Sequence, residues 1–175
     1  MARLPYVDPA DLPDDMRQAL AALPPLNLFR MVAHAQTAVE PFLRLGGTLL
    51  GQLDLEPRLR ELAVIHVARL CESDYEWKQH EPIARLCGVT DEQIAAVASG
   101  QVDGGPFDPR EAALLAFTRE VVQEVQVSTP VFEAMAAHLP PRQLVELTMA
   151  IGYYMTVARL AAMAEIEPDE EAAVG

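Results

Sequence analysis

Residues 57–88 of the chain read PRLRELAVIHVARLCESDYEWKQHEPIARLCG, and this stretch decides the fold. Apolar residues recur at helical spacing over residues 57–70, and a proline at the first helical position loses no backbone hydrogen bond. Residues 73–76 then have the composition of a capping box, which predicts a second helix beginning near Asp74. Gly88 fits the left-handed residue that commonly ends a helix. The stretch therefore predicts two consecutive helices.

Outward from this stretch, prolines and capping residues mark the other helix starts. The expected starts are Asn27, Thr90, Asp108-Pro109, Ser128-Thr129-Pro130 and Pro140-Pro141. Pro41 predicts a kink or break in the helix expected to follow Asn27, because a proline inside a helix removes one backbone hydrogen bond. No segment shows the alternation of a half-buried strand. We therefore expect an all-α subunit of seven or eight helices.

Composition excludes several classes of protein. The 175 residues carry 13 Lys+Arg and 26 Asp+Glu, and the net charge of −13 repels nucleic acid and anionic membranes. Hydrophobic residues make up 51% of the chain, too many for a disordered protein. The N-terminus lacks the apolar segment of a secretion signal, and apolar stretches such as residues 62–68 are shorter than the roughly 20 residues that cross a membrane. We expect a cytoplasmic protein with no nucleic-acid or membrane partner.

Neither a metal site nor a paired-cysteine motif is predicted. Cys71 and Cys87 do not stand at C-x-x-C spacing, and the histidines at 34, 66, 80 and 138 are scattered. We expect no metal and no cofactor. Tyr153-Tyr154 is expected in a buried helix or a subunit contact.

Three acidic and basic side chains form the candidate catalytic group. Glu76 and His80 are four residues apart, so they share one face of the predicted helix. Glu61, on the preceding helix, lies either at a wet edge or toward the interior, where a histidine of the next helix would be its natural partner. Such a pair fixes the imidazole tautomer and makes it a stronger base. In the alternative interpretation the three residues have only structural roles. Glu76 caps its helix, Glu61 is solvated, and His80 lies at the border of the apolar face with its hydrogen bonds satisfied.

The same residues resemble the signature of the carboxymuconolactone decarboxylase family, which includes the alkylhydroperoxidase AhpD. The resemblance rests on Glu61 with residues 73–77 (SDYEW) and 80–84 (HEPIA). It extends to residues 27–31 and to the helix containing residues 146–154, so it covers most of the chain.

The resemblance implies an all-helical, AhpD-like subunit that assembles into trimers or hexamers. Residues 1–175 would form a single domain, with residues 1–25 as an N-terminal extension and 166–175 as an acidic tail. In the peroxidase branch the glutamate and histidine flank a C-x-x-C pair, and here those two positions hold Ser73 and Glu76. Neither residue supplies a thiolate, so the disulfide chemistry of that branch is not available at this site.

The chain resembles the decarboxylase branch better, which implies a cofactor-independent carbon–carbon lyase acting on a small unsaturated lactone or carboxylic acid. His80 would be the proton shuttle and Glu61 would orient and charge-balance it. Ser73, Tyr75, Glu76 and Trp77 would line the pocket and bind the substrate.

An anionic substrate raises an electrostatic difficulty. A carboxylate at Glu76 would repel a carboxylated substrate unless one of them is protonated or Glu76 faces elsewhere. Local arginines would then be needed, and Arg30, Arg60 and Arg69 are the candidates. Two alternatives stay open: a thiol-dependent, alkylhydroperoxidase-like redox protein using Cys71, and a non-catalytic ligand-binding or scaffold oligomer.

Overall fold

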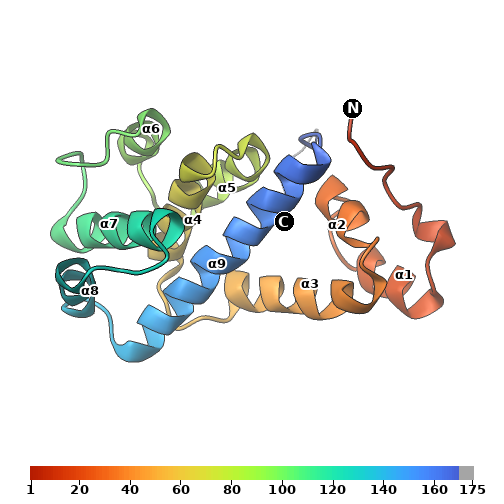
Figure 1. The fold of residues 1–175 in the computed structure, drawn as a ribbon, viewed down its shortest axis with the longest axis horizontal. Coiled ribbons are helices and arrows are strands. Elements are labelled where there is room, and N and C mark those ends of the chain that lie inside the picture. The colour runs from red at the N-terminus through yellow and green to blue at the C-terminus, as the bar shows by residue number, and fades with distance from the viewer. Residues whose placement is uncertain (170–175) are drawn as a thin grey trace.

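The computed structural model describes residues 1–169, and every regular element in this part of the chain is helical. A short 3-10 turn, Pro9–Asp11, precedes nine α-helices (Figure 1). They are α1 (Asp14–Ala21), α2 (Asn27–Val32), α3 (Gln36–Gly51), α4 (Pro57–Leu70), α5 (Asp74–Leu86), α6 (Asp91–Ser99), α7 (Pro109–Gln123), α8 (Thr129–Ala136) and α9 (Pro141–Ala164).

The all-α prediction is confirmed, but the described residues hold nine α-helices where seven or eight were expected. One additional helix, α1, lies in the N-terminal extension. The other arises because the single helix expected after Asn27 is divided into α2 and α3. The division falls at residues 33–35, whereas Pro41 lies inside α3. The break expected at Pro41 does not occur, because a helix tolerates the loss of one backbone bond when its other bonds persist.

The expected helix starts after residue 56 are confirmed. Thr90 and Asp108 each form a complete capping box, and Gly88 and Gly100 adopt the left-handed conformation with φ of 92° and 73°. Asn27 was a wrong choice of cap, since it is the first residue of α2 and its side chain donates a hydrogen bond to the Glu167 carbonyl.

Helices α4 and α9 form the centre of the molecule. α4 contacts α5, α6, α7 and α9, and α9 crosses the middle of the fold between the N-terminal helices and the rest (Figure 1). Every residue from Leu59 to Ala68 is buried, so α4 is covered on all sides. Glu61 lies within this stretch, so its side chain is shielded from solvent.

A second apolar cluster joins the N-terminal segment to this centre. Leu28 and Met31 of α2 pack with Val39 of α3, Tyr75 of α5 and Val157 of α9. The backbone N–H of Arg3 also donates to the Ala164 carbonyl at 2.8 Å. The extension is thus part of the packed fold. The end of the predicted acidic tail, residues 170–175, lies outside the described residues.

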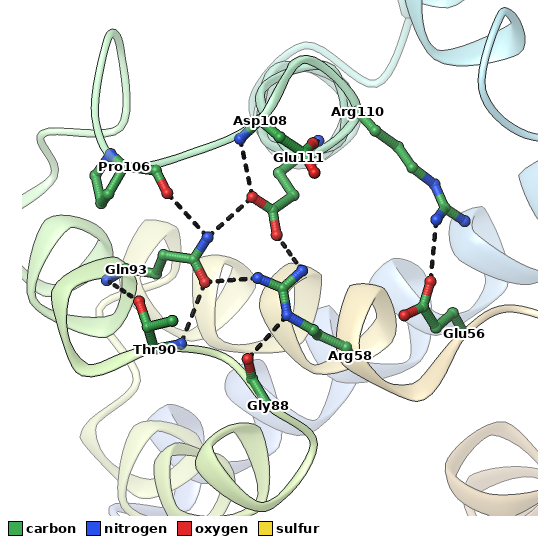
Figure 2. Close-up of polar contacts among 9 residues, drawn as sticks. All are labelled: Glu56, Arg58, Gly88, Thr90, Gln93, Pro106, Asp108, Arg110 and Glu111. Carbon is green, nitrogen blue, oxygen red and sulfur yellow. Dashed lines mark hydrogen bonds and ion pairs between the residues drawn. The ribbon is translucent and has the colours of Figure 1, made fainter.

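A polar network ties α4, α6 and α7 together (Figure 2). Arg58 forms an ion pair with Glu111 and donates to the Gln93 side chain and the Gly88 carbonyl, each at 2.9 Å. Gln93 in turn donates to Glu111 at 2.9 Å and to the Pro106 carbonyl at 3.0 Å. Because these polar side chains satisfy one another, the network fixes how the three helices meet.

α9 is long and apolar enough to cross a membrane by length and composition alone, which the sequence analysis did not foresee. Its 24 residues reach a mean hydropathy of 1.2 in the most apolar window, and 44% of that window is buried inside the fold. Its contacts with α3, α4, α5, α7 and α8 explain the apolar composition as that of a core helix.

Candidate active site

A cavity of about 310 Å³ lies where α5 and α9 face α2, α3 and the segment before α2. Most of its wall is apolar, supplied by residues such as Leu28, Leu43 and Val157. The polar atoms come mainly from α5 and α9. No lysine or arginine of the described chain lines it. The cavity can therefore enclose a small, largely apolar molecule.

His80 and Glu61 meet at the wall of this cavity. His80 Nδ1 lies 2.9 Å from Glu61 Oε2, and Arg60 Nε lies 2.9 Å from Glu61 Oε1. Glu61 is 0% exposed and His80 is 8% exposed. Of the two positions open to Glu61, a wet edge or the interior, the structure selects the interior.

The charge state of Glu61 follows from its two partners. Burial alone raises the pKa of its carboxyl group, but hydrogen bonds and opposite charge from His80 and Arg60 outweigh burial and hold the pKa below its ordinary value. Glu61 is therefore ionised and accepts a hydrogen bond from the Nδ1–H of His80. In the neutral ring the other nitrogen, Nε2, then carries the lone pair and can act as a base.

Aromatic side chains of α9 fix the histidine ring from the other side. His80 packs edge-on against Tyr154 with ring centroids 4.6 Å apart, and Tyr154 packs against Tyr153 at 5.4 Å. Tyr153 stacks on Phe42 of α3 at 4.7 Å. This supporting role of the two tyrosines was not predicted, because α9 and α5 are far apart in the chain and only packing brings them together.

Gly46 makes this aromatic packing possible. A Cβ atom at Gly46 would overlap the Tyr153 hydroxyl group and come within 2.7 Å of Tyr153 Cζ. The glycine thus lets the tyrosine ring lie directly against α3.

Replacing Gly46 with alanine is expected to displace Tyr153, and through Tyr154 to disturb His80. Overpacking of this kind typically destabilises a protein by about 1–3 kcal/mol. Thermal unfolding and ligand binding to the cavity would measure the effect. Gly51→Ala on the same helix is the matched control, since a Cβ atom added there would meet nothing within 4 Å. Equal behaviour of the two variants would contradict the steric argument.

Glu76 is the most unusual group in the cavity wall. It is 1% exposed, and neither carboxyl oxygen has a hydrogen-bond partner among the described residues. Burial, with no opposing charge, raises the pKa of this carboxyl group well above its ordinary value. The group is therefore a neutral carboxylic acid over a wider pH range than an exposed glutamate. The predicted capping box is only half formed: Ser73 Oγ accepts from the Glu76 N–H at 3.4 Å, but the Glu76 side chain does not return the bond.

The four predicted substrate-binding residues divide between two regions. Tyr75 and Glu76 line the cavity beside His80, whereas Ser73 and Trp77 line a different, more open hollow with Arg69. Trp77 directly follows Glu76, so it lies about 100° away from Glu76 around α5 and does not line the cavity. Ser73 serves as the N-cap of α5.

The candidate arginines and cysteines lie away from the cavity wall. Arg60 donates a hydrogen bond to Glu61. Arg69 donates to the Ala98 carbonyl at 2.8 Å, and Arg30 lies over the Tyr6 ring. Cys71 and Cys87 are free thiols, and burial is the main cause that raises the pKa of each. A raised pKa lowers the thiolate fraction at neutral pH, so the geometry does not favour thiol chemistry.

Known proteins resemble this chain in sequence profile and in fold. Residues 36–120 match the sequence profile of the carboxymuconolactone decarboxylase family. No curated protein matches the sequence.

Solved structures share the fold at low sequence identity. An AhpD-core, peroxidase-related protein from Ralstonia eutropha JMP134 superposes with a TM-score of 0.83 at 22% identity, over 97% of this chain and 93% of that one. A peroxidase-related protein from Silicibacter sp. TM1040 gives 0.82 at 17% identity, over 98% and 93%. The debrominase Bmp8, solved in complex with 2,3,4-tribromopyrrole, gives 0.77 at 14% identity, over 97% and 95%. These likenesses establish an AhpD-like fold.

Proposed function

We propose that this chain is a cofactor-independent, decarboxylase-like enzyme, because residues 36–120 match the sequence profile of the carboxymuconolactone decarboxylase family. Its substrate is a small unsaturated lactone or carboxylic acid, and the reaction proceeds by proton transfer through His80 and Glu61. The finding that carries the proposal is the buried Glu61–His80 pair at the wall of an apolar cavity.

The geometry supports a proton shuttle. Glu61 holds Nδ1, so Nε2 is the ring nitrogen that can exchange a proton with a ligand. The ionised Glu61 also stabilises the imidazolium form, which must exist for part of each cycle. Arg60 anchors the second oxygen of Glu61 and keeps the carboxylate from turning away.

The proposed chemical step balances without a metal or an organic cofactor. The bond between the substrate carbon and its carboxylate breaks, carbon dioxide leaves, and the electron pair delocalises into the unsaturated lactone. The imidazolium of His80 then delivers its Nε2 proton to carbon. Water returns a proton to the neutral ring before the next turnover.

The apolar wall favours loss of carbon dioxide. A carboxylate is poorly solvated among apolar side chains, while the transition state spreads the same charge over several atoms. No lysine or arginine of the described chain lines the cavity to stabilise the carboxylate before it reacts. The free-energy gap between bound substrate and transition state is thereby reduced.

The test is turnover in deuterium oxide. A carboxylated muconolactone, together with unsaturated lactones that lack the carboxylate, would be incubated with the purified protein. We expect carbon dioxide release from the first and deuterium incorporation at the carbon next to the unsaturated system in either. Product mass and NMR spectra would detect both. The proposal would be contradicted if neither carbon dioxide release nor deuterium incorporation exceeded the rate measured without the protein.

A double variant, Cys71→Ala/Cys87→Ala, serves as the control for the thiol alternative. Neither sulfur belongs to the cavity wall, so we expect the same turnover as the wild-type protein. A loss of turnover in the folded double variant would favour the redox protein that uses Cys71.

A further inference from the structure

We propose that Glu76 is the acid partner of His80, and that it donates a hydrogen bond to a carbonyl oxygen of the substrate while His80 acts at carbon. The inference rests on the proposed function and narrows its substrate class to small compounds that carry a carbonyl conjugated to the reacting carbon, such as a lactone or an enone.

The first support is the unsatisfied polar group itself. Buried polar atoms nearly always have partners, and one without a partner is expensive to keep. Both Glu76 oxygens are buried and unpartnered among the described residues, and the side chain forms part of the cavity wall. A ligand that accepts a hydrogen bond inside the cavity would supply the missing partner.

The second support is position. Glu76 and His80 lie one turn apart on α5, and both line the same cavity. A ligand small enough for about 310 Å³ would contact both side chains at once. One group would move a proton at carbon while the other stabilises negative charge as it develops on oxygen, which is the arrangement of an oxyanion site.

The surroundings of Glu76 keep its carboxyl group neutral. From α9, Tyr153 and Tyr154 face it, and from the end of α4 Cys71 does so; each is a neutral acid with a pKa raised chiefly by its own burial. The α2 and α3 residues of the wall carry no charge, and no salt bridge to Glu76 occurs in the described chain. A neutral acid can donate a hydrogen bond, whereas a carboxylate would repel an oxygen acceptor. This also removes the electrostatic difficulty that the sequence raised.

Binding of two matched probes tests the hydrogen bond. The unsaturated γ-lactone 2(5H)-furanone carries the carbonyl, and 2,5-dihydrofuran lacks it. In the wild-type protein we expect the lactone to bind more tightly. Glu76→Met should reduce that preference roughly tenfold, the usual worth of one buried hydrogen bond. Glu76→Gln, which keeps a donor, should retain most of it, and Glu72→Gln on the exposed surface should change nothing.

Protonation is measured independently of any ligand. Infrared difference spectra between the wild-type protein and Glu76→Gln at pH 7 should contain the carbonyl stretch of a protonated carboxyl group. The pKa of the Glu76 carboxyl group in the folded protein is raised above 4.5. The stability that the wild-type protein gains from Glu76, relative to Glu76→Gln, is therefore fully present below pH 4.5 and is lost as the pH rises through the folded pKa. Urea titrations across this range would follow the difference.

An unchanged probe preference in Glu76→Met, or the spectrum of a carboxylate at pH 7, would overturn the inference. The proposed function fails by a different result: Glu76-dependent binding of the lactone with no deuterium incorporation. Turnover that depends on His80 but survives unchanged in Glu76→Met would leave the proposed function standing and remove the acid role of Glu76.

Discussion

Replacing His80 with alanine is expected to lower kcat by about 10²–10⁴-fold, the range that a general acid–base residue typically contributes. The ring is the only imidazole on the described cavity wall, and its Nδ1 is held by Glu61 at 2.9 Å. KM should change much less, because the apolar wall that encloses the substrate remains.

Steady-state rates of carbon dioxide release and deuterium incorporation would measure this effect. His138→Ala is the matched control, since His138 is exposed and lies outside the cavity wall. The scaffold alternative predicts the opposite pattern, in which His80→Ala changes stability while turnover stays unaffected. That pattern would remove the proposed function.

Replacing Glu61 with leucine should be the most destabilising of the substitutions considered, by about 3–5 kcal/mol, because it leaves a buried charge without its partner. Arg60 is only 5% exposed, and its Nε donates to Glu61. Glu61→Gln keeps the shape of the side chain and should cost less stability. Both variants should lose turnover, since neither stabilises the imidazolium of His80.

Urea unfolding at several pH values checks the stability part of this prediction. The pKa of Glu61 is held below its ordinary value, so its stabilisation is present above about pH 4.5 and is lost as the pH falls through the folded value. The difference between wild type and Glu61→Gln should therefore shrink in acid. Glu56→Gln, which breaks an exposed ion pair with Arg110, should cost no more than about 1 kcal/mol. Equal effects at positions 61 and 56 would contradict the buried-pair argument.

Local signals predicted much of the fold. Proline at the first helical position, the capping boxes at Thr90 and Asp108 and the left-handed glycines act within a few residues, so they can be identified in the sequence alone. The prediction was less accurate in residues 1–51. The break between α2 and α3 carries no comparable signal, and the packing of the extension against α9 depends on contacts far away in the chain.

The candidate site was also predicted only in part, because local spacing is visible in the sequence and distant contacts are not. The i, i+4 spacing of Glu76 and His80 indicated one shared face, and the Glu61–His80 pairing was foreseen as one of two possibilities. The spacing could not tell which side of α5 would face the cavity. Ser73 and Trp77 were therefore grouped with Tyr75 and Glu76, although they line a different hollow.

By itself, then, the sequence determined the helices after residue 56, the absence of a C-x-x-C pair and the set of acidic and basic residues that chemistry could use, because each of these depends only on neighbours along the chain. Tertiary structure alone decided that Glu61 is buried and ionised between Arg60 and His80, and that Glu76 has no partner among the described residues. The protonation state of a side chain depends on the solvent and charges around it, and those come from helices that only folding brings together.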